Sequence, residues 1–363
     1  MGSLSRPTSP EQVTAAWLTS ALQANGVIPA DVEVSSVRRE VLGGGTGVFG
    51  TLARLVVDYT EPLAGPKYMV LKMPTSAPEN KAVGLALGLY LREAQFFATM
   101  ADQTPVDTVK CFYNDMDVEN GEFILLIDEI RNMTVGDQTG GATVAQLETA
   151  LVEFAKFHAA WWKNPDLQKL DWLPTNDSPA NMVVVPEIMR NAMTVIEKDW
   201  ADVIGPEAVA LGNELAAQFE SILTRVGEVA HTLCHGDARL ENVFFNDDAS
   251  KMKFIDFQLV IRATPAQDIA YLMGSSADTK TWDEHGIRLL HHYHDALVAA
   301  GVSDYTWDQF WYEFRLQALW GVVAPASMVA SFDVGDENGK LLSRRWMERG
   351  WHIPVAINAR EIL

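Results

Sequence analysis

The residues best suited to chemistry stand in one short run, His235-Gly236-Asp237-Ala238-Arg239-Leu240-Glu241-Asn242, and in a carboxylate, Asp256, fourteen residues beyond it. Transfer of a phosphoryl group to an alcohol needs a carboxylate near the reacting hydroxyl and oxygen ligands for Mg²⁺. Asp237 and Asn242 can meet both needs from one loop, with Asp237 facing the acceptor and Asn242 facing a metal ion. Asp256 ends an apolar stretch and can supply the anionic ligand of a metal that bridges the β- and γ-phosphates. Arg239 can place a positive charge near the transferring group.

Each of these residues alone would fit an ordinary surface loop, and their order and spacing together favour the catalytic interpretation. The elements that must position them change character along the chain. Strand patterns precede a helix-rich remainder. His158 falls on the inward face of one expected helix, and we expect it to be a hydrogen-bonded core residue. Strands are expected at 32–41, 51–59, 67–72, 110–113, 122–127 and 252–257, and helices at 82–100, 143–162 and 207–229.

A glycine cluster lies between the first two expected strands. It consists of Gly43, Gly44, Gly45, Thr46 and Gly47. Such a segment can lay backbone N–H groups over phosphates without obstruction by side chains, although a plain hairpin turn has the same composition. It is not a Walker A loop, because no Lys-Ser or Lys-Thr pair follows it.

The motifs resemble those of a known superfamily. The H-G-D-x4-N run, the sequence Ile255-Asp256-Phe257-Gln258 and the segment Pro265-Ala266-Gln267-Asp268-Ile269-Ala270 resemble the aminoglycoside phosphotransferase and choline-kinase-like superfamily. Within it, they are most similar to the ecdysteroid-kinase-like small-molecule kinases. The H-G-D-x-R-L-x-N spelling also resembles the kinase-like domains attached to certain acyl-CoA dehydrogenases. The resemblance spans roughly residues 42–273.

This resemblance implies an α+β, bilobal protein-kinase-like fold. A strand-rich, nucleotide-binding lobe is expected at 1–130 and a mostly helical, catalytic and acceptor-binding lobe at 131–363. The resemblance further implies that Asp237 is the catalytic base and that Asn242 and Asp256 are Mg²⁺ ligands. Asp268 would be the structural aspartate that braces the catalytic loop.

The first third of the chain is expected to bind the nucleotide. Lys72, at the end of a strand, fits the kinase lysine that grips the α- and β-phosphates, and Glu93 fits its helix partner. Glu79 is a rival for that partner, and isolated surface charges are the plain alternative for all three. By position alone, the resemblance implies that backbone groups near Asp128 and Ile130 bind the adenine ring.

Composition limits the partners. Lys plus Arg total 28 against 48 Asp plus Glu, a net charge of −20, which argues against nucleic acid and against an anionic membrane surface. Cys111 and Cys234 lie far apart and imply no disulfide framework. The first residues lack the apolar core of a secretory signal. We therefore expect a soluble, cytoplasmic protein.

The expected activity is that of an ATP- and Mg²⁺-dependent phosphotransferase acting on a hydroxyl of a small molecule. Gly236 and Gln258 replace residues of the protein-kinase signatures, which disfavours a protein acceptor. A catalytically silent, nucleotide-binding relative is the alternative. The superfamily includes kinases of aminoglycosides, macrolides, sugars, sterol-like alcohols and hydroxyacyl compounds. The acidic composition favours a cationic acceptor and the aromatic late helices favour an apolar one, so the acceptor class stays open.

Overall fold

The computed structural model describes residues 4–42, 49–331 and 337–363 of the chain. The chain divides into two compact units. The first comprises Met1–Asn132 together with the short segment Ile255–Leu259, and the second comprises Met133–Phe254 and Val260–Leu363. The segment 255–259, which carries Asp256, therefore belongs to the first unit although it lies far along the sequence.

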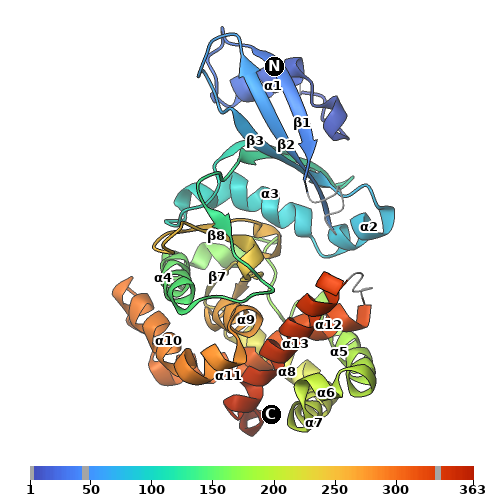
Figure 1. Cartoon of the computed structure of the whole chain (residues 1–363), viewed down its shortest axis with the longest axis vertical. Coiled ribbons are helices and arrows are strands. Elements are labelled where there is room, and N and C mark those ends of the chain that lie inside the picture. Colours follow the sequence, from blue (N-terminus) through green and yellow to red (C-terminus); the bar gives the residue numbers. More distant parts are fainter. Residues whose placement is uncertain (1–3, 43–48, 332–336) are drawn as a thin grey trace. The chain divides into compact units, whose positions relative to one another are not determined.

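The first unit is built on a five-stranded antiparallel sheet with the strand order β1-β2-β3-β5-β4 (Figure 1). Its β-branched and aromatic residues suit the pleated surface of a sheet. The strands are β1 (Val34–Val41), β2 (Gly50–Tyr59), β3 (Tyr68–Pro74), β4 (Cys111–Asp117) and β5 (Glu122–Asp128).

Two helices cover opposite faces of this sheet. One face packs against α1 (Ala15–Ala24), and the buried Leu71 and Met73 of β3 belong to that core. Side chains alternate between the faces of a strand, so Lys72, between these two residues, points to the other face. That face carries Phe123 and Leu125, which pack with Tyr90 of α3 (Leu89–Thr99). The alternation thus directs the Lys72 ammonium toward α3.

The helix that we predicted over 82–100 is two helices, α2 (Pro78–Ala86) and α3. Gly88 separates them with φ of 67°, a left-handed conformation that glycine adopts without steric cost. Near the start of the chain, Pro10–Gln12 form a 3₁₀ turn and Thr14 caps α1. These breaks move the helix boundaries but keep Glu93 on a helix.

The second unit is mostly helical. Thr143 and Gln146 form a capping box at the start of its first helix, close to the start expected at residue 143. The helix expected over 207–229 is again two, because Gln218 leaves the helical conformation with φ of −132°. The helices are α4 (Val144–Ala160), α5 (Pro179–Asp199), α6 (Ala201–Ile204), α7 (Pro206–Ala217), α8 (Phe219–Glu228), α9 (Ala266–Ser276), α10 (Thr279–Ala299), α11 (Trp307–Gly321), α12 (Val323–Ser331) and α13 (Glu337–Ala356).

Two small antiparallel sheets frame the loops of this unit. One has the order β6-β8-β9 and the other pairs β7 with β10. The run 235–242 joins β7 to β8, and β9 leads to Asp256. The expected strand over 252–257 ends earlier, because Asp256 has φ of 64° and turns the chain away. The strands are β6 (Thr134–Val135), β7 (Thr232–Cys234), β8 (Val243–Phe245), β9 (Met252–Phe254) and β10 (Ile261–Ala263).

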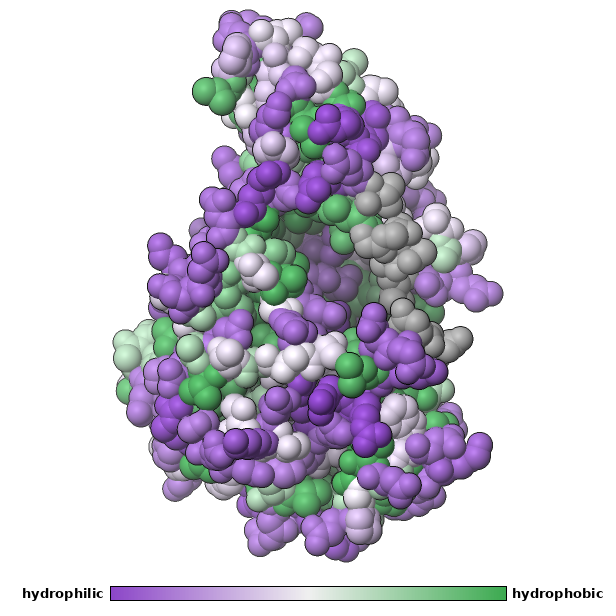
Figure 2. All heavy atoms as spheres, in the orientation of Figure 1, coloured by the Kyte–Doolittle hydropathy of each residue, from purple (hydrophilic) through white to green (hydrophobic). Residues whose placement is uncertain are grey.

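This architecture is the predicted α+β fold, with the sheet in the first unit and the helices concentrated in the second. On the face shown in Figure 2, hydrophilic residues cover much of the surface and hydrophobic residues gather in small groups. Across the described parts of the chain, no helix combines the length and the apolar character that crossing a membrane requires.

Candidate active site

A buried ion cluster joins three of the predicted site residues in the first unit. The Lys72 Nζ atom lies 2.7 Å from Glu93 Oε2 and 2.9 Å from Oε1, so the ammonium engages both carboxylate oxygens. The same nitrogen donates to Asp256 Oδ1 at 2.8 Å. Lys72 and Glu93 are buried, whereas Asp256 keeps partial contact with water. Glu93, rather than its rival Glu79, is thus the glutamate that pairs with Lys72.

Aromatic packing holds Asp256 in this cluster. The Phe257 ring stacks on Phe96 of α3, with 3.8 Å between ring centroids, and meets Phe97 edge-on at 5.9 Å. Phe96 follows Glu93 by three positions, which places both on one side of the helix. The left-handed backbone at Asp256 turns its carboxylate toward Lys72 while Phe257 packs on α3. Aspartate tolerates this conformation better than most non-glycine residues.

Burial and mutual attraction set the charges of this cluster. Burial by itself would lower the pKa of Lys72, but the carboxylates of Asp256 and Glu93 outweigh it and raise that pKa. Burial raises the pKa of Glu93, and the Lys72 ammonium opposes the rise. With Lys72 charged, two carboxyl groups share one ammonium, and Asp256 is the more exposed of the two.

In the second unit, the run 235–242 brings three predicted residues together. The Asn242 side-chain amide donates to Asp237 Oδ2 at 2.7 Å and to the Asp237 backbone oxygen at 3.0 Å. Arg239 Nε lies 3.3 Å from the Asp237 carboxylate, and its guanidinium also pairs with Glu241. Asp237 and Asn242 are almost fully buried. The amide nitrogen of Asn242 is therefore committed to Asp237, which leaves its carbonyl oxygen as the atom that could face a metal ion.

Asp268, at the start of α9, holds the beginning of this run. Its carboxylate accepts from the backbone N–H groups of His235 at 2.7 Å and Gly236 at 2.9 Å. His158 contributes a third contact at 3.0 Å and bonds to the Tyr293 hydroxyl at 2.7 Å. The bracing role expected for Asp268 and the core position expected for His158 are therefore both seen in the structure.

Cys234, which precedes the run, is unsuited to nucleophilic chemistry. Its side chain is fully buried and its thiol donates to the Thr264 backbone oxygen. Burial raises its pKa well above the ordinary value, so the thiolate is not formed near neutral pH.

Tyr271 is a site residue that the sequence reasoning missed. Burial raises its pKa, and the Asp237 carboxylate raises it further by its negative charge and by a hydrogen bond. Tyr271 lies three positions after Asp268 on α9, so the two residues occupy successive turns of one helix side. That spacing was a signal available in the sequence. A helix that braces the run through Asp268 can also reach Asp237 through the residue one turn later, which is Tyr271.

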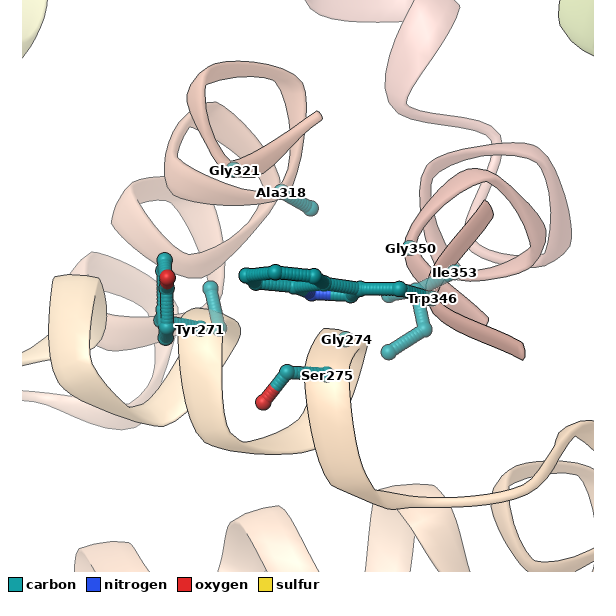
Figure 3. Close-up of a pocket in the computed structure, with 9 residues that line it drawn as sticks. Tyr271, Gly274, Ser275, Ala318, Gly321, Trp346, Gly350 and Ile353 are labelled. Carbon is teal, nitrogen blue, oxygen red and sulfur yellow. The ribbon is translucent and has the colours of Figure 1, made fainter. Parts of the chain in front are cut away.

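A small cavity beside Tyr271 is filled by Trp346 of α13 (Figure 3). The indole extends across the cavity toward the Tyr271 ring, and the two rings meet edge-on with 6.2 Å between centroids. The remaining space is about 10 Å³, enough for one water molecule at most. Small residues of α9, α11 and α13 form the walls, namely Ala270, Gly274, Ala318, Gly321 and Gly350.

The other predicted residues are placed as follows. The glycine cluster, Gly43, Gly44, Gly45, Thr46 and Gly47, lies outside the described residues. Asp128 ends β5, where its N–H donates to the Lys110 oxygen at 2.8 Å, and Ile130 follows in an irregular segment. A role of Asp128 and Ile130 at the adenine ring therefore stays a prediction.

Comparison with solved structures identifies the fold. The GDP complex of wild-type aminoglycoside 2'-phosphotransferase-IIIa is 14% identical, with a TM-score of 0.53, and the match covers 96% of this chain and 99% of that one. Ethanolamine kinase from Plasmodium vivax is 10% identical, with a TM-score of 0.51, covering 91% of this chain and 85% of that one. At such identities the likeness concerns the fold, and it confirms the predicted bilobal, kinase-like architecture.

Family membership rests on the sequence itself. A search of curated proteins found no match to this chain. Residues 45–301, by contrast, match the ecdysteroid kinase-like family, and this range includes Lys72, Glu93, the run 235–242 and Asp256. Since the match covers more than half of the sequence, the chain belongs to the ecdysteroid kinase-like family.

Proposed function

We propose that this protein is an ATP- and Mg²⁺-dependent phosphotransferase that transfers the γ-phosphate to a hydroxyl group of a small molecule. The observation that carries the proposal is the cluster in which Lys72 contacts both Glu93 and Asp256. A buried lysine held by a helix glutamate, beside a carboxylate on a distant loop, is the arrangement with which kinases grip nucleotide phosphates and their metal ion.

The donor atoms suit Mg²⁺, which prefers hard oxygen ligands. The Asp256 carboxylate and the carbonyl oxygen of Asn242 are the residues that would hold it. The ion, when bound, would neutralise the charge that spreads over the phosphate oxygens. Lys72, kept charged by its two carboxylate neighbours, positions the α- and β-phosphates, and Glu93 fixes the direction of the ammonium.

Asp237 is the residue that we assign to the acceptor. Its carboxylate, fixed by Asn242 and Arg239, orients the acceptor hydroxyl and takes its proton. The bond between the acceptor oxygen and the γ-phosphorus forms as the bond to the β-phosphate oxygen breaks, and ADP leaves. Arg239 adds positive charge near the transferring group. Positioning and electrostatics supply most of the acceleration in such transfers.

The test is a screen for ADP release over a library of alcohols, with Mg²⁺·ATP and with Mg²⁺·GTP. The library should include amino sugars, macrolides, neutral sugars, sterol-like alcohols and hydroxyacyl compounds. We expect acceptor-dependent ADP release that Asp237→Asn lowers by orders of magnitude. Tight binding of Mg²⁺·ATP with no ADP release for any acceptor would instead identify a catalytically silent, nucleotide-binding relative.

A further inference from the structure

Gln138, between β6 and α4, contacts the middle of the run 235–242. It is 2% exposed, and its Oε1 accepts from the Leu240 backbone N–H at 2.7 Å. Its Nε2 donates to the Ser275 backbone oxygen at 2.6 Å, so both ends of the amide are engaged. Leu240 lies between Arg239 and Asn242. The run is thus held at its start by Asp268 and at its middle by Gln138.

Arg349 of α13 holds the backbone that carries Gln138. The guanidinium is 2% exposed and donates to the Gln138 oxygen at 2.6 Å and the Thr139 oxygen at 3.0 Å. It also donates to the Ser275 oxygen at 3.1 Å, the acceptor that the Gln138 side chain uses. Asp278 provides the compensating carboxylate, 2.7 Å from Arg349 Nη2.

The backbone around Gln138 is shaped to admit this guanidinium. Gly141 has φ of 84°, and a Cβ at that position would lie 2.7 Å from Arg349 Nη2. A larger residue would therefore be strained and would collide with the arginine. The close fit makes Arg349 a component of this loop and not a peripheral charge on α13.

Helix α13 lies wholly beyond residue 301, where the family match ends. The same helix places the Trp346 ring 6.0 Å from the guanidinium carbon of Arg239 and fills the cavity beside Tyr271. Helix α13 thus contacts the run directly through Trp346. It also acts on the run indirectly, because Arg349 holds Gln138 and Gln138 bonds to Leu240.

We propose that Gln138 and Arg349 are positioning residues for phosphoryl transfer, because they set the place of Leu240 and hence the geometry between Asp237 and Asn242. The proposal rests on the proposed function. Neither residue contacts the reacting atoms. Their effect passes through hydrogen bonds to the backbone, so their loss changes the rate of transfer and leaves nucleotide binding by Lys72 and Glu93 intact.

The plain alternative is that these buried polar groups only stabilise the second unit. Four variants of this 363-residue chain separate the two roles. Gln138→Leu removes the acceptor for Leu240, and Gln138→Glu keeps an acceptor oxygen while losing the donor to Ser275. Arg349→Met removes the guanidinium. Leu297→Ala, in the buried face of α10, is the control that lowers stability without touching the run.

Three readouts are measured for each variant at a temperature where all are folded. They are hydrogen–deuterium exchange of the peptide covering residues 238–244, the Kd of ATP in the absence of Mg²⁺, and kcat for ADP release with Mg²⁺ and an acceptor from the screen or water. Gln138→Leu and Arg349→Met should speed exchange of this peptide and lower kcat by roughly 10- to 100-fold, the cost of a small misplacement at a reacting centre. The Kd measured without Mg²⁺ should change by less than about twofold, because Lys72 and Glu93, which are assigned to phosphate binding, lie outside the run.

Gln138→Glu should retain most of the activity, and the peptide covering residues 238–244 should stay protected from hydrogen exchange, since the new carboxylate still accepts from the Leu240 N–H. Leu297→Ala should lose stability with kcat unchanged. Equal losses of kcat in Leu297→Ala and Gln138→Leu at matched melting temperatures would overturn the proposal, as would unchanged exchange of the peptide in both Gln138→Leu and Arg349→Met. A wild-type protein that never releases ADP would overturn the proposed function, while the exchange data would still decide whether the two residues hold the run.

Discussion

Replacing Lys72 by Met tests the buried ion cluster, because methionine keeps much of the side-chain length and removes the ammonium. The side chains of Lys72 and Glu93 are 11% and 3% exposed, so the variant leaves Glu93 buried without its partner. Removing one member of a buried ion pair costs about 3–5 kcal/mol. Asp256, 23% exposed, can regain water, so we expect a loss in the free energy of unfolding near the lower end, about 3 kcal/mol.

The loss should depend on pH, and its sign follows from Glu93. Burial raises the pKa of Glu93 from 4.5 to about 7 although Lys72 opposes the rise, so without Lys72 the pKa rises further. A carboxyl group whose pKa is raised in the folded state destabilises that state once it is ionised. This destabilisation grows as the pH rises from the pKa of the unfolded state to the pKa of the folded state. Urea unfolding followed by circular dichroism should show a small loss at about pH 5 and a large one at about pH 8.

Lys67→Met is the matched control, since Lys67 directly precedes β3 and pairs with Asp58 on the surface. The two side chains are 53% and 55% exposed. Exposed pairs are screened by water and contribute little, so this variant should unfold much like the wild type at both pH values. If Lys72→Met costs no more than Lys67→Met at about pH 8, or the same at both pH values, the reasoning about the buried cluster is wrong.

Three further outcomes are expected. Mg²⁺·ATP should raise the melting temperature of the wild type, because a ligand that binds only the folded state stabilises it; an unchanged melting curve at millimolar nucleotide would contradict the kinase assignment. Asp256→Ala should weaken nucleotide binding measured by calorimetry in the presence of Mg²⁺ more than in its absence, and equal weakening would indicate a structural role. Asp237→Asn should lower turnover by roughly 10² to 10⁴ with nucleotide affinity nearly unchanged, whereas Asn242→Ala should lose both; near wild-type turnover in Asp237→Asn would remove its assignment to the acceptor.

Much of the site could be predicted because it is encoded in short-range order. The run from His235 to Asn242 fixes the spacing of Asp237 and Asn242 within one loop. The alternation along β3 directs Lys72 away from the core side that Leu71 and Met73 occupy. Asp268 braces the run as the family resemblance implied, although 32 positions separate it from Gly236. For Asp237, Asn242 and Lys72, local geometry limits the direction of the side chain, whereas the placement of Asp268 followed from the resemblance.

What could not be predicted depends on contacts between distant segments. Gln138 and Arg349 are 211 positions apart, and no periodicity links them. Trp346 belongs to an amphipathic helix whose inward residues look alike in sequence, so only packing shows which one meets Tyr271. The helix breaks at Gly88 and Gln218 were missed because apolar periodicity continues across them while the backbone turns.

The placement of residues 255–259 in the first unit has a consequence for how the protein is made. During synthesis the sheet and α3 emerge first, with Lys72 and Glu93 already present. Asp256, whose carboxylate also pairs with Lys72, and Phe257, whose ring packs on Phe96, are added only after β9 has been translated. Because chains fold progressively from the N-terminus on the ribosome, the nascent first unit exposes Phe96 until Phe257 arrives. A ribosome-bound chain ending near residue 132 should therefore be a natural client of chaperones that bind exposed aromatic surface.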